Sequence, residues 1–237
     1  MTSAKDQGEI DRNSKAEHRL PAIIATCVAI LLYAFLPSDV LPLWIRLPVV
    51  ALATLLLIAV SVVNPAKLDH GVKLFRLASL SLAIMLVTAN AAALVITITL
   101  LIVTKPEDGP GVLAAAAQVW ATNLIAFSLL MWELDRGGPV RRKQRSREDL
   151  PPADFRFPQD EDQDTTSEVA EQSAIESDWR PSYVDYFYEA GVASMAFSPG
   201  AGVPIRPRAK LLLTCQSLMS FVLLALVIAH AVGALGG

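Results

Sequence analysis

Residues 77–104 read LASLSLAIMLVTANAAALVITITLLIVT, a run from Leu77 to Thr104 that holds no charged side chain. A helix rises about 1.5 Å per residue and the hydrocarbon core of a bilayer is about 30 Å thick, so this run is long enough to cross a membrane. It is too long for one upright crossing and too short for two crossings with a turn between them. The run therefore favours a single tilted or extended transmembrane helix.

Four other apolar runs lie on either side of this one. They are Leu20–Pro37, a run from Leu41 or Leu47 to Val63, Val112–Trp132, and Lys210 to about Leu235. Hydrophobic residues make up 53% of the chain and lie in long blocks, whereas a soluble core spreads them along the sequence. We expect an all-α fold: an integral membrane helical bundle of about five transmembrane helices, plus a short interfacial or re-entrant helix.

The polar segments divide the chain into four parts. We expect a disordered cytoplasmic tail over residues 1–19 and a four-helix membrane region over 20–135. A polar, largely disordered cytoplasmic insert follows over 136–180, and residues 181–237 form a short amphipathic or re-entrant helix and the last transmembrane helix. The insert is expected to be disordered because a segment of low hydrophobicity and high charge cannot bury enough apolar surface to fold.

Lysine and arginine residues gather beside alternate ends of the apolar runs. Most lie in the amino-terminal tail, between the second and third runs, and in the insert. Because cytoplasmic loops carry the excess of basic residues, this pattern predicts a multi-pass protein of the cell membrane. Its amino terminus and insert would lie in the cytoplasm and its carboxyl terminus outside.

Partners and cofactors can be anticipated from the same residues. The basic half of the insert, Arg141 to Arg147, indicates contact with anionic lipid headgroups, and the alternative is that it only fixes the orientation. We expect the lipid bilayer as the main partner, a homo-oligomer as a further candidate, and no nucleic acid. Cys27 and Cys215 lie inside apolar runs without a metal-ligand spacing, so we expect no metal and no cofactor.

Polar side chains inside the apolar runs are candidate functional residues, because an unpaired polar group is costly in hydrocarbon. The main ones are uncharged: Asn90 in the third run, Gln118 and Asn123 in the fourth, and Gln216 in the fifth. Hydrogen bonds between helices would explain them, and a polar pathway is the alternative.

Two carboxylates, Glu133 and Asp135, stand where the fourth run ends, in the stretch WELDRGGP. Carboxylates at the carboxyl end of a helix oppose the helix dipole, so we expect them to have basic partners. The candidates are Arg136, Arg141 and Arg142 nearby, and Arg206 or Arg208 beside the last run. Acid–base catalysis is the alternative, but no nucleophile accompanies the pair, which favours a structural role.

A shorter aromatic stretch, SYVDYFYEAGVASMA, precedes the turn Phe197-Ser198-Pro199-Gly200. It is too short to span a bilayer. It predicts either an interfacial helix or a re-entrant helix that the bundle protects. We regard Phe197, Ser198 and Pro199 as candidate functional residues together with Glu133, Asp135 and Arg136.

Several of these motifs carry a resemblance. WELDRGGP (Trp132–Pro139), DFRFPQ (Asp154–Gln159), and DYFYEAG, AFSPG and RAKLLLTCQS after Trp179 resemble an uncharacterised bacterial multi-pass membrane protein family. The likeness covers the chain from about the third apolar run to its end. It implies a membrane protein, and the family has no assigned activity to carry over.

The carboxyl-terminal part also looks like the pore loop and inner helix of two-helix potassium channels. A potassium filter is built from stacked backbone carbonyls of a TVGYG-type strand. This chain has AFSPG there instead, and Pro199 restricts the backbone that would line a filter. The resemblance therefore implies a degenerate pore-loop module. Because Arg206, Arg208 and Lys210 follow the turn, we expect the turn to face the cytoplasm, whereas a potassium-channel pore loop faces outside.

These observations leave two functional hypotheses. The first is a non-enzymatic membrane protein whose insert and short amphipathic segment serve lipid or partner interaction. The alternative is a transport protein related to pore-loop channels that lacks a potassium selectivity filter. The absence of a catalytic constellation favours the first.

Overall fold

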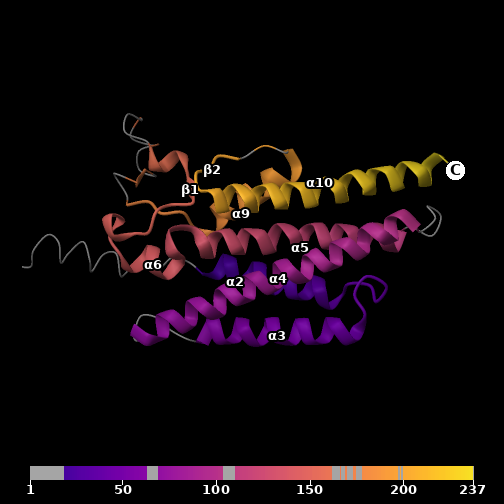
Figure 1. The fold of residues 1–237 in the computed structure, drawn as a ribbon, viewed down its shortest axis with the longest axis horizontal. Helices are drawn as coiled ribbons and strands as arrows, with labels where there is room; N and C mark the ends of the chain where they lie inside the picture. Colours follow the sequence, from indigo (N-terminus) through magenta and orange to yellow (C-terminus); the bar gives the residue numbers. More distant parts are fainter. Residues whose placement is uncertain are drawn as a thin grey trace, which may run out of the picture.

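Six helices dominate the protein, which we describe from a computed structural model covering residues 19–62, 69–103, 110–161, 166, 169, 173–174, 178–196, 198 and 200–236. They are α2 (Leu20–Ala34), α3 (Leu43–Val62), α4 (Asp69–Val103), α5 (Pro110–Leu134), α9 (Tyr183–Ala196) and α10 (Pro207–Gly236). The long helices lie side by side along the long axis of the molecule (Figure 1). The expected all-α helical bundle is confirmed.

Among the described residues, four helices are long and apolar enough to cross a membrane: α3, α4, α5 and α10. The sequence predicted about five. The difference is α2, which is apolar but has only 15 residues and so measures about 22 Å at 1.5 Å per residue. It ends at Ala34 because Pro37 follows closely, and the residue before a proline avoids the helical conformation.

Helix α5 is the centre of the bundle and packs against α2, α4, α9 and α10. In the most apolar part of each helix, 61% of the residues of α5 are buried inside the protein, compared with 6% of those of α3. The outer faces of α3, α4 and α10 expose large aliphatic side chains such as Leu55, Val95 and Leu218. Such a belt of exposed aliphatic side chains is unfavourable in water and favourable where a surface faces lipid.

Short elements form a cap over one end of the bundle (Figure 1). They are η3 (Asp135–Gly137), α6 (Pro139–Gln144), η4 (Arg147–Asp149), β1 (Phe155–Arg156), η5 (Pro158–Asp160) and β2 (Val203–Pro204). We call residues 135–161 with β2 the cap. Strand β1 pairs antiparallel with β2, with Phe155 opposite Pro204.

The cap differs from the largely disordered insert that the sequence predicted for 136–180. Residues 136–161 are folded, and Phe155 and Phe157 are buried among side chains of the bundle end. They can fold because α5, α9 and α10 supply the apolar partners that this polar segment lacks by itself. Most of residues 162–177, and the expected tail over 1–18, lie outside the described residues.

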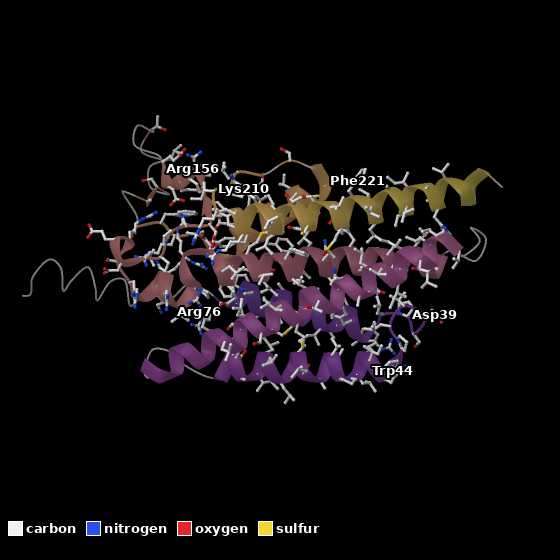
Figure 2. All side chains as sticks on the ribbon, in the orientation of Figure 1. Asp39, Trp44, Arg76, Arg156, Lys210 and Phe221 are labelled. Atoms are coloured by element: carbon white, nitrogen blue, oxygen red, sulfur yellow. The ribbon has the colours of Figure 1, made fainter. Side chains whose placement is uncertain are left out.

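Basic side chains lie at the cap end of the molecule. Figure 2 shows Arg76, Arg156 and Lys210 near the cap, and Asp39 and Trp44 at the opposite end. The carboxyl terminus also lies away from the cap (Figure 1).

Helix α9 enters the bundle from the cap end and the chain returns to that same end. Tyr183 near its start bonds to Ser128 of α5, and Ser194 near its end reaches Ser220 in the middle of α10. The chain then comes back to β2, which pairs with β1 in the cap. Helix α9 therefore has the shape of the re-entrant alternative, packed along the long helices.

Candidate functional site

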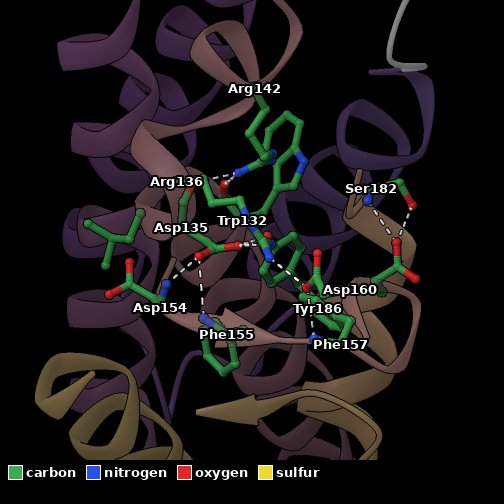
Figure 3. A network of polar contacts seen from close by, with 12 residues as sticks. Trp132, Asp135, Arg136, Arg142, Asp154, Phe155, Phe157, Asp160, Ser182 and Tyr186 are labelled. Carbon is green, nitrogen blue, oxygen red and sulfur yellow. Dashed lines mark hydrogen bonds and ion pairs between the residues drawn. The ribbon is translucent and has the colours of Figure 1, made fainter. Parts of the chain in front are cut away.

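The centre of the candidate site is Asp135, a fully buried carboxylate directly after α5. Its oxygens accept hydrogen bonds from Arg136 Nη1 at 2.9 Å and from the backbone nitrogens of Asp154 at 2.6 Å and Phe155 at 3.3 Å. The Tyr186 hydroxyl of α9 donates a further bond (Figure 3). Four donors from three segments thus offset the burial of this charge.

The backbone after Asp135 turns sharply to make this possible. Arg136, Gly137 and Gly138 have φ values of 49°, 80° and 91°. A Cβ on Gly138 would lie 3.0 Å from the carbonyl oxygen of Glu133. The two glycines of WELDRGGP are therefore required for the chain to leave α5 and fold back over it.

Arg136 connects Asp135 to Asp160, whose Oδ2 lies 2.6 Å from Arg136 Nη2. Asp160 Oδ1 also pairs with Arg147 Nη2 at 2.6 Å, and its Oδ2 accepts the backbone N–H of Phe157 at 3.0 Å. One carboxylate thus joins two arginines from different parts of the cap. This confirms Arg136 as the basic partner of Asp135.

Arg142 of α6 is buried where the cap meets the bundle. Its Nη1 donates to the carbonyl oxygen of Trp132 in the last turn of α5 at 2.9 Å, and to that of Asp135, directly after α5, at 2.7 Å. Its guanidinium also lies 6.0 Å from the Trp132 ring centroid and 5.5 Å from that of Tyr186. A cation at the carboxyl end of α5 satisfies carbonyls that a helix leaves open and complements the dipole.

A second pair fastens the cap to α10. Asp154 Oδ1 lies 2.6 Å from Arg208 Nε and 3.9 Å from Arg206 Nε. Both arginines were expected beside Glu133 and Asp135, and their carboxylate partner in the structure is Asp154. Glu133 is buried, facing the space between α2 and α5.

The aromatic residues of two motifs meet at this end. Tyr186 contacts Phe155 and Phe157 edge to face, with ring centroids 5.9 Å and 5.5 Å apart. Trp179 packs against Phe157 in the same way at 5.8 Å. DFRFPQ and DYFYEAG are thus two halves of one aromatic cluster, in a geometry that aromatic rings favour.

Sequence analysis missed Glu189, a buried carboxylate of α9. The backbone N–H groups of Gly200 and Gly202 donate to it, and a Cβ on Gly200 would lie 2.6 Å from its Oε1. Burial raises its pKa above the ordinary value, and the N–H donors oppose this shift. The signal that could have revealed it is an acid inside an aromatic stretch followed by a glycine-rich turn.

The turn after α9 was the other candidate. Ser198 is exposed, and Phe197 and Pro199 lie outside the described residues. The described part of this turn binds Glu189 through the N–H groups of Gly200 and Gly202.

Polar residues inside the helices form a continuous chain. Asn90 Nδ2 donates to Asn123 Oδ1 at 3.0 Å, and Asn123 Nδ2 donates to Ser220 Oγ at 3.0 Å. Ser220 and Gln216 then bond to Ser194 at 3.2 Å and 3.1 Å. Three of the four candidate residues, Asn90, Asn123 and Gln216, are thus brought together. The side chain of Gln118 is half-buried, and its backbone carbonyl accepts a bond from the Thr122 hydroxyl.

This polar chain runs across the bundle, not along it. Asn90, Asn123 and Ser220 each lie near the middle of α4, α5 and α10 within their apolar stretches. Residues at one depth join neighbouring helices, whereas a pathway needs polar groups spaced along the helix axes. The geometry favours helix association, as interhelical hydrogen bonds do in membrane bundles.

Two pockets lie near the cap. One, about 360 Å³, is open and is lined by Arg136, Arg147, Arg156 and Asp160. The other, about 80 Å³, lies among α2, α3, α4 and α5. Within the described part of the chain, no three His, Cys, Asp or Glu side chains gather as a metal site requires.

No family model, curated protein or solved structure matches this chain. The buried charges of the site are held by one another, by N–H groups or by aromatic faces, and these contacts anchor the cap to the bundle.

Proposed function

We propose that this is a non-enzymatic integral membrane protein whose cap lies on the cytoplasmic leaflet and binds anionic lipid headgroups. The observation that carries this proposal is the Asp135 network, which fixes the cap rigidly to the ends of α5 and α9. A rigid platform holds basic side chains in place beside the membrane surface.

The basic cluster of the insert divides into two groups. Arg142 is held by the carbonyl oxygens of Trp132 and Asp135, and Arg147 is held by Asp160. Arg145 is exposed, and Arg141 and Lys143 are half-buried. We assign the lipid contact to these last three residues.

Binding of an anionic glycerophospholipid by the delipidated protein tests this assignment. Each basic residue near an anionic surface contributes about 1 kcal/mol, so changing Arg141, Lys143 and Arg145 to Gln should weaken binding about 100-fold. Native mass spectrometry at low salt measures the bound lipid. The matched control changes Arg141 and Arg145 to Lys, which keeps the charge and should keep the binding. Equal binding by the Gln variant would contradict the proposal.

Orientation is tested at Ser146, beside the basic cluster. With Cys27 and Cys215 replaced by Ala, a Ser146→Cys variant should react with an impermeant maleimide only when the cytoplasmic face is accessible. Labelling only from the outside would overturn the cytoplasmic placement of the cap.

A transport protein is the second candidate, favoured by the α9 hairpin, which enters and leaves the bundle at one end as a pore loop does. Recording from folded protein in planar bilayers tests it. Absence of current across several salts and voltages would eliminate the channel form.

A further inference from the structure

The pocket among α2, α3, α4 and α5 has the properties of a binding site for an amphiphile. Its volume is about 80 Å³, and it is partly enclosed by the helices. Apolar side chains, among them Leu57, Leu82 and Leu129, form most of its wall. Arg19 and Glu133 lie at the edge of this wall nearest the cap. The site thus combines an apolar interior with a charged mouth, as ligand pockets commonly do.

Ser79 gives the pocket a polar group that the described protein does not satisfy. Its side chain lines the pocket and is 95% buried, since only 5% is exposed. No described residue bonds to its hydroxyl. Burial of a hydroxyl without a partner is costly, so this group calls for a hydrogen-bond acceptor from outside the described chain.

The neighbouring hydroxyls show that this is unusual for these helices. A helical hydroxyl commonly bonds to the carbonyl four residues earlier. Five threonines of α2, α3 and α4 do so at 2.7–2.9 Å: Thr26, Thr54, Thr88, Thr97 and Thr99. Ser79 of α4 does not, which leaves its hydroxyl available to an occupant of the pocket.

The depth of Ser79 indicates the acceptor. The apolar stretch of α4 begins at Arg76, so Ser79 lies about 4.5 Å into it at 1.5 Å per residue. This is the interfacial depth at which the ester carbonyls of a glycerophospholipid lie. A hydrocarbon chain below the ester would contact Leu57, Leu82 and Leu129.

The mouth indicates the headgroup. Arg19 and Glu133 give the mouth both signs of charge, Arg76 lies within electrostatic reach of Glu133, and Arg19 and Glu133 also interact within the protein. A carboxylate here disfavours an anionic head. A zwitterionic head matches both signs, with its phosphate beside Arg19 and its ammonium beside Glu133.

We propose that this pocket holds the ester region of one zwitterionic glycerophospholipid, whose ester carbonyl accepts a hydrogen bond from Ser79. The proposal rests on the membrane insertion assumed for the proposed function, but not on the anionic contact of the cap. The two sites differ in residues and in headgroup charge, so each can fail alone.

Lipid exchange followed by native mass spectrometry tests the site. Delipidated full-length protein is given phosphatidylethanolamine or phosphatidylglycerol at equal concentrations, and one ethanolamine lipid should remain bound with clear preference. Ser79→Ala should weaken this binding about fivefold, the usual effect of one hydrogen bond. Ala83→Leu fills the pocket and should weaken it more than tenfold. The Gln variant of Arg141, Lys143 and Arg145 should leave it unchanged.

The matched control is Ala92→Leu, which adds the same side chain to an exposed position of α4 and should bind lipid as the parent does. Thermal unfolding reports whether each variant is folded. If Ala83→Leu does not fold, Ser79→Ala and cross-linking decide the matter. An ethanolamine lipid with a diazirine in its acyl chain should label α2, α4 and α5 at the pocket.

Three outcomes would overturn the proposal. They are equal retention of the two lipids, unchanged binding by Ser79→Ala, and labelling spread over the outer faces of α3 and α10. The third outcome would mean that another part of the same chain covers the pocket.

Discussion

At the scale of single residues, the protein contrasts buried charges with exposed ones. Asp135 is fully buried and accepts from four donors. Arg156 and Glu161 form a pair of which about half of each side chain is exposed. Removing one partner of a buried, bonded pair leaves uncompensated groups, whereas water replaces the partner of an exposed one.

We therefore expect Asp135→Ala to lower the free energy of unfolding by about 3–5 kcal/mol. Arg156→Gln should change it by less than about 1 kcal/mol. Chemical unfolding in detergent micelles, followed by circular dichroism, measures both. Equal effects would show that the Asp135 network does not hold the cap in place.

The glycines that enclose Glu189 should also be sensitive. Gly200→Ala places a methyl group within contact of the carboxylate and should cost about 1–3 kcal/mol of stability. Gly111→Ala is the control, because no atom lies within 4 Å of the added carbon and alanine favours a helix. Thermal unfolding compares the two, and a neutral Gly200→Ala would mean that the turn does not close on Glu189.

Glu189 should make stability depend on pH. Its pKa is raised mainly by burial and further by the charge of Asp185, and the N–H donors of the turn lower it. A raised folded-state pKa favours the protonated form, so the stability it adds is complete below the ordinary value of 4.5 and is lost as pH rises through the folded-state pKa.

Glu189→Gln removes this titration while keeping the shape. The stability of the parent relative to Glu189→Gln should therefore fall as pH rises above about 4.5, measured as the difference between their unfolding curves. A constant difference between pH 4 and 8 would contradict the assignment.

At the scale of elements, the helices were predictable and the cap was not. Long apolar runs such as Leu77–Thr104 reveal their helices because length and hydropathy are local properties. The end of α2 was missed because it depends on the backbone before Pro37. The folded cap was missed because Phe155 and Phe157 are buried only against Tyr186 of a distant helix.

The same reasoning explains which site residues could be found. Asp135 and Arg136 stand out beside an apolar run, and the intramembrane amides stand out within one. Pairing of Asp154 with Arg208, 54 residues later, has no local signal. Glu189 was not predicted because its partners are backbone N–H groups, so its signal is limited to an acid inside an aromatic stretch followed by a glycine-rich turn.

The polar chain should contribute to helix association. Interhelical hydrogen bonds average about 0.6 kcal/mol, so Asn123→Ala, which removes bonds to Asn90 and Ser220, should cost about 1–2 kcal/mol. Thr88→Val is the control, because its exposed hydroxyl bonds only to its own helix in the described contacts. A double-mutant cycle of Asn90→Ala and Asn123→Ala measures their coupling, and zero coupling would refute the chain.

At the scale of the whole molecule, the exposed aliphatic belt predicts how the chain partitions. Leu55 lies in the apolar stretch of α3 and is 64% exposed. A charge at the centre of a membrane helix costs about 2.5–3.5 kcal/mol in insertion. Leu55→Arg should therefore reduce the inserted fraction in a translocation assay. Val203→Arg in the cap is the control and should insert as the parent does.

The connections of Asp135 also govern when the protein can mature. Its partner Tyr186 is 51 residues further along the chain. Arg208, the partner of Asp154, comes 54 residues after Asp154. At about 5–20 residues per second, a ribosome needs about 3–10 s to deliver that partner. During this interval α5 and Asp135 are already synthesised, but Tyr186, whose hydroxyl bonds to the Asp135 carboxylate, is not. Closure of the cap is thus a late event of biogenesis, and a chain interrupted before its last helix would lack the arginine that pairs with Asp154.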